Sequence, residues 1–74
     1  MKERVIRLNE VNDVEEFIRA AEQCEFHISL IYQHASIDGK SILGVFCFLA
    51  KDMKVSYLGE NQVFEQILQK YAVA

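Results

Sequence analysis

One uncharged stretch limits what this chain can fold into more than any other feature of the sequence. Residues 37–50 read IDGKSILGVFCFLA, and the last nine of them, residues 42–50, carry no charge. A membrane-spanning helix needs about 20 consecutive apolar residues, so this run is too short to be one. An unbroken apolar run can form either a buried strand or a short helix, and its periodicity cannot decide between them. The flanking segments therefore decide its structure.

Four short segments of the sequence predict β-strands, at residues 3–8, 26–33, 35–37 and 53–57. The first is rich in β-branched side chains, which favour strands. The second and fourth alternate along the chain, so that every other side chain is apolar and lies on one face. The Gln33-His34 pair between the second and third strands departs from the Asn-Gly that a tight hairpin prefers. The turn geometry there stays open.

Two other segments have the periodicity of amphipathic helices. Asn12 is followed three residues later by Glu15, the spacing of a capping box, so we expect a helix from Asn12 to about Cys24. A last helix is expected to begin around residues 60–62, after Gly59 interrupts the fourth strand. The apolar stripes are Val14, Phe17, Ile18 and Ala21 in the first helix, and Val63, Phe64, Ile67, Leu68 and Tyr71 in the last.

The uncharged stretch lies between the predicted strands at residues 35–37 and 53–57. We therefore expect it to form a helix that connects them. Ser41 is a good helix N-cap. At about 100° per residue, Gly44, Val45, Phe48 and Leu49 fall on one side, and Ile42, Leu43 and Phe46 fall on another. A two-layer fold can cover only one side. We therefore expect the second group to be an exposed partner surface, and Phe46→Ser to change the free energy of unfolding by under about 0.5 kcal/mol.

The predicted order of elements is β-α-β-β-α-β-α, which defines the fold class. Helices collected on one face of a four-stranded, mainly antiparallel sheet make an α+β two-layer sandwich. A chain of 74 residues is expected to form one domain, residues 1–74. Neither end carries the pattern of a targeting signal, so we expect a cytoplasmic protein that does not enter a membrane.

Composition argues against several classes of function. The net charge of −3 argues against binding to nucleic acid, which usually needs a basic face. Cys24 and Cys47 are expected to be reduced, packed thiols, and their spacing with His27 and His34 matches no closed zinc site. The sequence shows no nucleophile–base pair and no paired carboxylates in a pocket. We therefore expect no enzyme activity, no metal and no cofactor.

The Lys40–Val45 segment, KSILGV, resembles the K-S-I-M-G-V segment of HPr, the histidine phosphocarrier protein of the bacterial sugar phosphotransferase system. The order of elements, the length and the spacing from Val14 to Ala72 also agree with that family. The resemblance implies an HPr-like fold and makes Ser41 the counterpart of a regulatory serine that HPr kinase phosphorylates. It also implies a partner-binding surface formed by Lys40, Ile42, Leu43 and Phe46.

The chain departs from the HPr family at the start of the first helix. Phosphocarriers have a G-(L/I)-H-A-R-P motif there, in which histidine takes the phosphoryl group and arginine steadies it. The corresponding segment here is LNEVNDVEEF, which has neither histidine nor proline and carries Glu10, Asp13, Glu15 and Glu16. A phosphoryl group at that place would meet like charges. We therefore expect that the chain is not a histidine phosphocarrier.

These observations predict a regulatory, partner-binding protein linked to the phosphotransferase system and switched at Ser41. Its expected partners are HPr kinase and other phosphotransferase-system or regulatory proteins. Weak self-association through Ile42, Leu43 and Phe46 would use the same surface equally well. The alternative is a non-catalytic protein-interaction module that keeps only the HPr-like fold.

Overall fold

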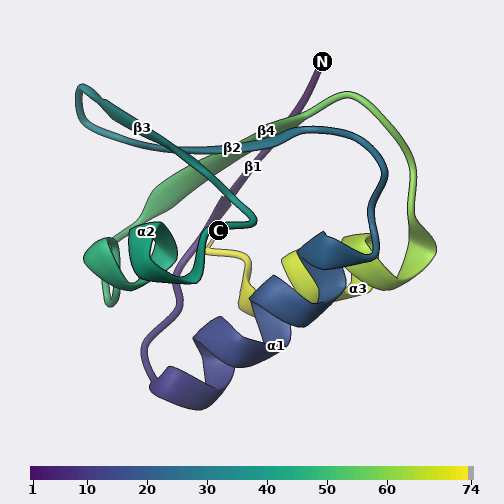
Figure 1. Ribbon diagram of the computed structural model, residues 1–74. Coiled ribbons are helices and arrows are strands. Elements are labelled where there is room, and N and C mark those ends of the chain that lie inside the picture. Colours follow the sequence, from purple (N-terminus) through teal and green to yellow (C-terminus); the bar gives the residue numbers. More distant parts are fainter. Residues whose placement is uncertain (74) are drawn as a thin grey trace.

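The computed structural model describes residues 1–73, and its elements follow the predicted order (Figure 1). The elements are β1 (Lys2–Ile6), α1 (Val11–Glu22), β2 (Ile28–Tyr32), β3 (Ala35–Asp38), α2 (Ile42–Cys47), β4 (Met53–Tyr57) and α3 (Gln62–Tyr71). The prediction that the uncharged stretch forms a helix is confirmed. None of the helices in this part of the chain has the length and apolar character needed to cross a membrane.

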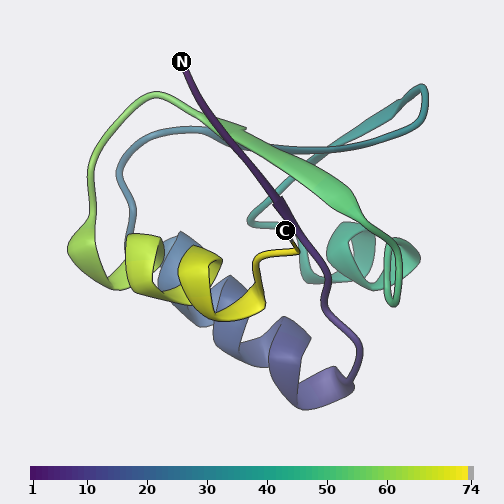
Figure 2. The same ribbon diagram turned by 180° about the vertical axis from the view of Figure 1, so that it is seen from behind.

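The sheet has the strand order β1-β4-β2-β3, and every neighbouring pair is antiparallel. The predicted α+β two-layer class is confirmed, because all three helices lie on one side of this sheet (Figures 1 and 2). Leu30 on β2 is aligned with Val55 on β4 and with Ile37 on β3. Alternate residues of the strands face the helices and the others face away.

The core lies between the sheet and the helices, and its largest fully buried side chains come from both layers. They are Ile6, Leu8, Val14, Phe17, Ile28, Leu30, Val45, Met53, Val55, Phe64 and Leu68. The apolar stripe predicted for α3 is buried only in part, because Val63 is 57% exposed. Val63 lies at the first turn of α3, on the side of the helix away from the sheet and beside α1.

The first helix begins earlier than its sequence pattern predicts. Glu10 is the N-cap of α1, and the Asp13 carboxylate accepts hydrogen bonds from the backbone N–H groups of Asn9 and Glu10, both at 3.1 Å. The predicted capping box of Asn12 and Glu15 is therefore wrong. An acidic side chain at the third position of a helix satisfies the N-cap amide. Asp13 stands three residues after Glu10, just as Glu15 stands three residues after Asn12, so the spacing in the sequence allowed either start.

The two edges of the sheet differ. Residues that follow α3 pair with β1, through a bridge between Ile6 and Ala72 and a hydrogen bond of 3.0 Å from the Val73 N–H to the Val5 carbonyl. The other edge is β3, which carries no further strand among residues 1–73. The end of the described chain therefore protects one edge and holds the end of α3 beside β1.

Within residues 1–73, two residues other than glycine have a left-handed backbone. Gln33, at the hairpin tip left open by the sequence, has a φ of 55°, and Ala50, after α2, has a φ of 64°. The Ala50 N–H donates to the Leu8 carbonyl at 2.7 Å, which joins the loop after α2 to the segment before α1. This backbone conformation costs a residue with a Cβ atom roughly 1–2 kcal/mol.

We expect Ala50→Gly to raise the stability of the protein by about 1 kcal/mol, because glycine adopts the left-handed conformation without that cost. The hydrogen bond to Leu8 uses the backbone and is kept. The matched control is Ala35→Gly, at an exposed strand position, where glycine should lower stability. Urea denaturation of the three proteins measures both effects, and a loss of stability in Ala50→Gly would contradict the prediction.

Candidate functional site

Ser41 begins α2 as the sequence predicts. Its side-chain oxygen accepts the Gly44 N–H at 3.2 Å, and its own backbone is extended. Gly44 lies against β3, where an added Cβ atom would come within 3.1 Å of the Ile37 Cδ1 atom. Val45 is fully buried beneath this turn. Together these contacts fix α2 against the sheet and leave Ser41 exposed at its start.

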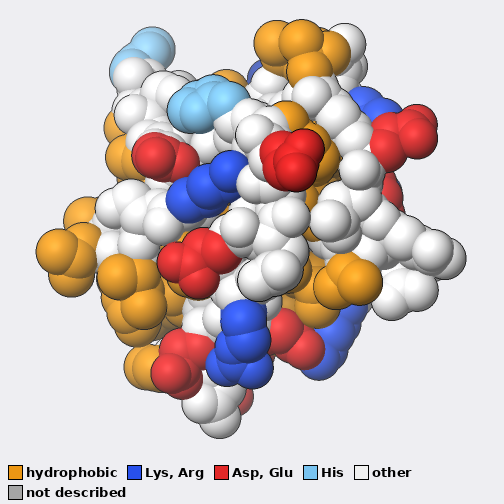
Figure 3. Space-filling model, turned by 45° about the vertical axis from the view of Figure 1, so that its right-hand side comes forward, with side chains coloured by type: hydrophobic (Ala, Val, Ile, Leu, Met, Phe, Trp, Pro, Cys, Tyr) orange, Lys and Arg blue, Asp and Glu red, His pale blue; other side chains and the backbone are white. Residues whose placement is uncertain are grey.

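The apolar residues that follow Ser41 are not equally exposed. Ile42 is 44% exposed and Leu43 is 78% exposed, whereas Phe46 is partly buried and packs against the core. We call Ile42 and Leu43 the α2 patch; hydrophobic side chains gather at the left-hand edge of Figure 3, over α2. The predicted exposure of Phe46 is therefore wrong, because the helix is short and the large ring reaches the core at its edge. We now expect Phe46→Ser to destabilise the fold.

Lys40 has a structural contact that the sequence did not reveal. Its Nζ atom donates to the Cys24 backbone carbonyl at 2.7 Å, and the side chain is partly buried there. That carbonyl lies just beyond the end of α1, where a cation satisfies free carbonyl groups and interacts favourably with the helix dipole. The Lys40 ammonium group thus joins α1 to the loop before α2. It is not a free cation beside the α2 patch.

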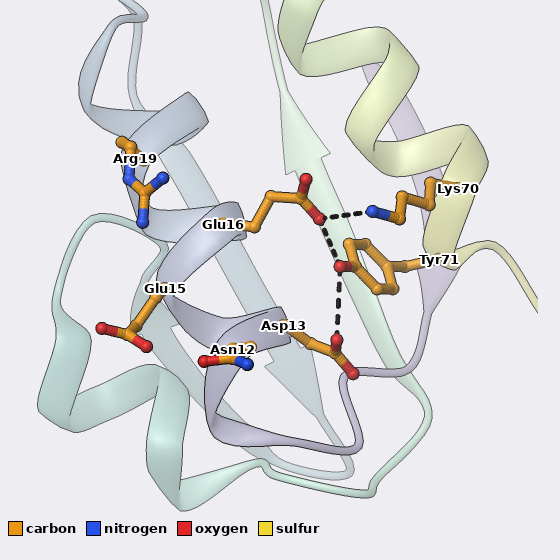
Figure 4. A pocket seen from close by; sticks show the side chains of 7 residues that line it. All are labelled: Asn12, Asp13, Glu15, Glu16, Arg19, Lys70 and Tyr71. Carbon is orange, nitrogen blue, oxygen red and sulfur yellow. Dashed lines mark hydrogen bonds and ion pairs between the residues drawn. The ribbon is translucent and has the colours of Figure 1, made fainter.

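The start of α1 holds carboxylates where a phosphocarrier holds its histidine. Tyr71, at the end of α3, donates its hydroxyl to Glu16 and lies 3.3 Å from the Asp13 Oδ1 atom. Lys70 donates to the same Glu16 oxygen at 2.9 Å (Figure 4). We call Asp13, Glu16, Lys70 and Tyr71 the Tyr71 clasp. The hollow over it, about 340 Å³, is also lined by Asn12, Glu15 and Arg19.

Electrostatics in the Tyr71 clasp oppose the binding of an anion. Hydrogen bonds from Tyr71 and Lys70 hold the pKa of Glu16 below its ordinary value. Burial and the hydrogen bond to Glu16 hold the pKa of the Tyr71 phenol well above its ordinary value. The carboxylate of Asp13 already uses the N–H groups of Asn9 and Glu10. Two of the donors around this helix start are therefore taken by Asp13, and a phosphoryl group there would lie beside the carboxylates of Asp13 and Glu16.

Neither histidine lies at the start of α1. His34 is exposed at the hairpin tip, and His27 precedes β2 on the sheet face away from the helices. The Nε2 atom of His27 lies 3.1 Å from the Ser29 hydroxyl, an imidazole–hydroxyl contact that the sequence pattern did not predict. Because residues two apart on a strand share a face, the spacing of His27 and Ser29 in the sequence could have indicated this contact. No third side chain in residues 1–73 hydrogen-bonds this imidazole, so the orienting group of a catalytic triad is missing.

The two cysteines differ in their surroundings. Cys24 is a packed thiol, as expected; its Sγ atom lies 3.5 Å from the Ala20 carbonyl, and burial raises the pKa of the thiol. Cys47, at the end of α2, is exposed, so its predicted packing is wrong. No three histidine, cysteine or acidic side chains of residues 1–73 come together in a group that could hold a metal ion.

The sequence matches no protein-family profile, and no curated protein is similar to it. Its fold does match solved structures. HPr-C-His from Thermoanaerobacter tengcongensis superposes with a TM-score of 0.74 at 17% identity, over 95% of this chain and 93% of that one. The phosphocarrier protein HPr from Bacillus anthracis strain Ames superposes with a TM-score of 0.73 at 11% identity, over 95% of both chains. The chain has the HPr-like fold.

We expect Tyr71→Phe to lower the melting temperature by several degrees. The substitution leaves the ring in place and removes the hydroxyl that donates to Glu16, and one net hydrogen bond contributes about 1 kcal/mol. In a domain of this size such a loss lowers the melting temperature by roughly 4–8 °C. The matched control is Tyr32→Phe, whose hydroxyl has only a long contact of 3.4 Å with the Gln33 amide. Equal melting temperatures for the two variants would show that the Tyr71 hydroxyl contributes nothing to stability.

The Tyr71 clasp should also make stability depend on acidic pH. Because the folded protein lowers the pKa of Glu16 below its ordinary value of 4.5, the contribution of Glu16 is present above that pH and is lost as the pH falls through the folded pKa. We therefore expect Glu16→Gln to have a flatter stability profile between about pH 6 and pH 3 than the unchanged protein. Glu25→Gln, at an exposed position without an ion pair in residues 1–73, should retain the original profile. Thermal unfolding across this range measures the difference.

Proposed function

We propose that this chain is an HPr-like regulatory protein of the bacterial sugar phosphotransferase system. It acts in the cytoplasm by binding partner proteins through the α2 patch, and it does not carry phosphate on histidine. The observation that carries the proposal is the exposure of Leu43 and Ile42 directly after Ser41 in an HPr-like fold. Leaving large apolar side chains in water gives up roughly 1.5–3 kcal/mol each, so a pair of them on one short helix indicates a use.

The start of α1 supports the part of the proposal that concerns phosphate. Histidine is absent there, and the Asp13 carboxylate accepts the N–H groups of Asn9 and Glu10. Glu16 brings a second carboxylate within reach of the same tyrosine. A phosphoryl group at this helix start would lie beside two anions. The HPr-like fold here therefore provides a binding surface without the phosphocarrier reaction.

Ser41 is the residue through which we propose that binding is regulated. Its hydroxyl is exposed and points to the Gly44 N–H at the first turn of α2. A phosphate at a helix start interacts favourably with the helix dipole by about 0.3–1 kcal/mol, so modification need not unfold the domain. It would add about −1.5 to −2 charges beside the α2 patch and alter which partners bind there.

The alternative is a protein-interaction module that has kept only the fold. The low identity to the two HPr structures, 17% and 11%, favours this alternative, and the same α2 patch would serve it. Binding separates the two candidates. A phosphotransferase-system protein should bind enzyme I or HPr kinase with an affinity that depends on Leu43, whereas an unrelated module should bind neither.

We expect Leu43→Ser to weaken binding to enzyme I or HPr kinase by roughly tenfold or more, since burying a leucine is worth about 1.5–3 kcal/mol. Leu43 is mostly exposed, so the melting temperature should stay nearly unchanged. Val63→Ser is the matched control, because Val63 is also exposed but lies on α3 beside α1. Surface plasmon resonance measures the affinities. Unchanged binding of Leu43→Ser would remove the α2 patch from the proposal.

We expect HPr kinase with ATP to place acid-stable phosphate on Ser41 and not on Ser36, which is also exposed. Phosphoenolpyruvate with enzyme I should leave His27 and His34 unlabelled. Phosphopeptide mass spectrometry locates the label, and an ordinary HPr serves as the positive control for both enzymes. Acid-labile phosphate on either histidine would contradict the proposed loss of the carrier reaction.

A further inference from the structure

The α2 patch borders a face of α1 that carries two acidic side chains, Glu15 and Glu22. Val11, Glu15, Ile18 and Glu22 follow one another at helical spacing on α1, and Ile42 of α2 closes the hollow that Glu15, Ile18 and Glu22 line. Ile18, which is buried, lies in this hollow, and Val11, near the start of α1, is 54% exposed. The α2 patch therefore adjoins this face of α1 across the hollow, where Glu15 and Glu22 lie on either side of Ile18.

The two carboxylates are available to a partner. Neither Glu15 nor Glu22 forms an ion pair within residues 1–73, and the Glu15 side chain points away from the Tyr71 clasp (Figure 4). Arg19 also lines the hollow, so its single positive charge faces two carboxylates and a net negative charge remains. In Figure 3, acidic side chains lie next to the hydrophobic ones over this part of the surface.

We infer that the surface formed by the α2 patch, Glu15 and Glu22 binds a basic amphipathic helix of a partner protein. The inference rests on the proposed function and adds the chemistry of the partner. Glu15 and Glu22 are seven residues apart, so their backbones lie about 10 Å apart along α1. A partner helix lying along α1 and bearing Lys or Arg at two positions seven residues apart matches that spacing. Apolar residues three and four positions after the first basic residue would lie on the same face and reach Ile42 and Leu43.

Charge complementarity favours this occupant over a second copy of the chain. A symmetric dimer through the α2 patch would bring the same surface of both copies together. Glu15 and Glu22 of one copy would then lie near the same residues of the other, and like charges across an interface oppose association. The net charge of −3 adds to that repulsion. A basic partner would avoid both the repulsion between the carboxylates and the repulsion between two chains of negative net charge.

The test uses designed helical peptides of about 18 residues, long enough to form a helix on binding. One peptide carries Lys at positions i and i+7 with Leu at i+3 and i+4, and its matched control carries Glu in place of both lysines. Titration of the ¹⁵N-labelled protein, followed by NMR, gives the affinity and the position of each peptide. We expect the Lys peptide to bind at least about tenfold more tightly, to shift the amide signals of α1 and α2, and to weaken as salt rises.

Variants of the protein separate the charge from the apolar contact. Glu15→Lys with Glu22→Lys should lose most binding of the Lys peptide and gain binding of the Glu peptide. Glu15→Gln with Glu22→Gln should lose the preference between the peptides, and it covers the case in which the lysines disturb folding. The control is Glu25→Lys with Glu60→Lys, two exposed positions that change the net charge equally and should leave the preference intact.

Several results would overturn the inference. These are binding of neither peptide, equal binding of both, or the same loss of preference in the control variant. Dimers in solution that Leu43→Ser converts to monomers would identify a second copy as the occupant. The proposed function fails separately, if Leu43→Ser leaves binding to enzyme I and HPr kinase unchanged. Loss of that binding in Leu43→Ser, together with no effect of the charge variants on either peptide, would overturn only the partner chemistry.

Discussion

Phe64 holds the helix layer on the sheet, and the arrangement of the remaining elements depends on that contact. It is fully buried near the start of α3, with ring centroids 5.7 Å from Phe17 of α1, 5.4 Å from Tyr57 of β4 and 6.3 Å from Phe26 before β2. Such aromatic pairs contribute about 0.5–1.5 kcal/mol beyond the area that they bury. The Tyr57 hydroxyl adds a bond of 2.6 Å to Glu65 of α3. With α3 placed in this way, its last turn brings Tyr71 to the start of α1.

The Tyr71 clasp shows how one fold can support different chemistry at the same place. A helix start offers free N–H groups to an anion, and in this chain the Asp13 carboxylate accepts two N–H groups there, those of Asn9 and Glu10. The consequence is structural, because Tyr71 and Lys70 then connect α3 to Glu16 of α1. An HPr-like backbone alone therefore does not imply phosphate transfer, since function depends on the side chains at the site.

Around α2, some side chains stabilise the fold and others remain exposed. Lys40 is used internally, where it joins the end of α1 to the loop before Ser41. Phe46 and Val45 secure the short helix from beneath, so that Leu43 can remain in water without loosening it. The side chains that remain exposed on this face include Ile42 and Leu43, Ser41 at the helix start and the carboxylates of Glu15 and Glu22. In the proposal made above, the negative charge on that face selects a basic partner.

Periodicity along the sequence determined most of the elements and the side of each strand that is buried, because these depend on spacing within one segment. The helix after Ser41 was instead inferred from its place between two strands and from serine as a helix cap. The match of KSILGV to the HPr family added the fold. Contacts between segments far apart in the chain decided the rest. Tyr71 meets Glu16, and Lys40 meets the Cys24 carbonyl, only after α1, α2 and α3 have packed together. The burial of Phe46 likewise depends on how closely a helix of six residues lies against the core, which no spacing rule can provide.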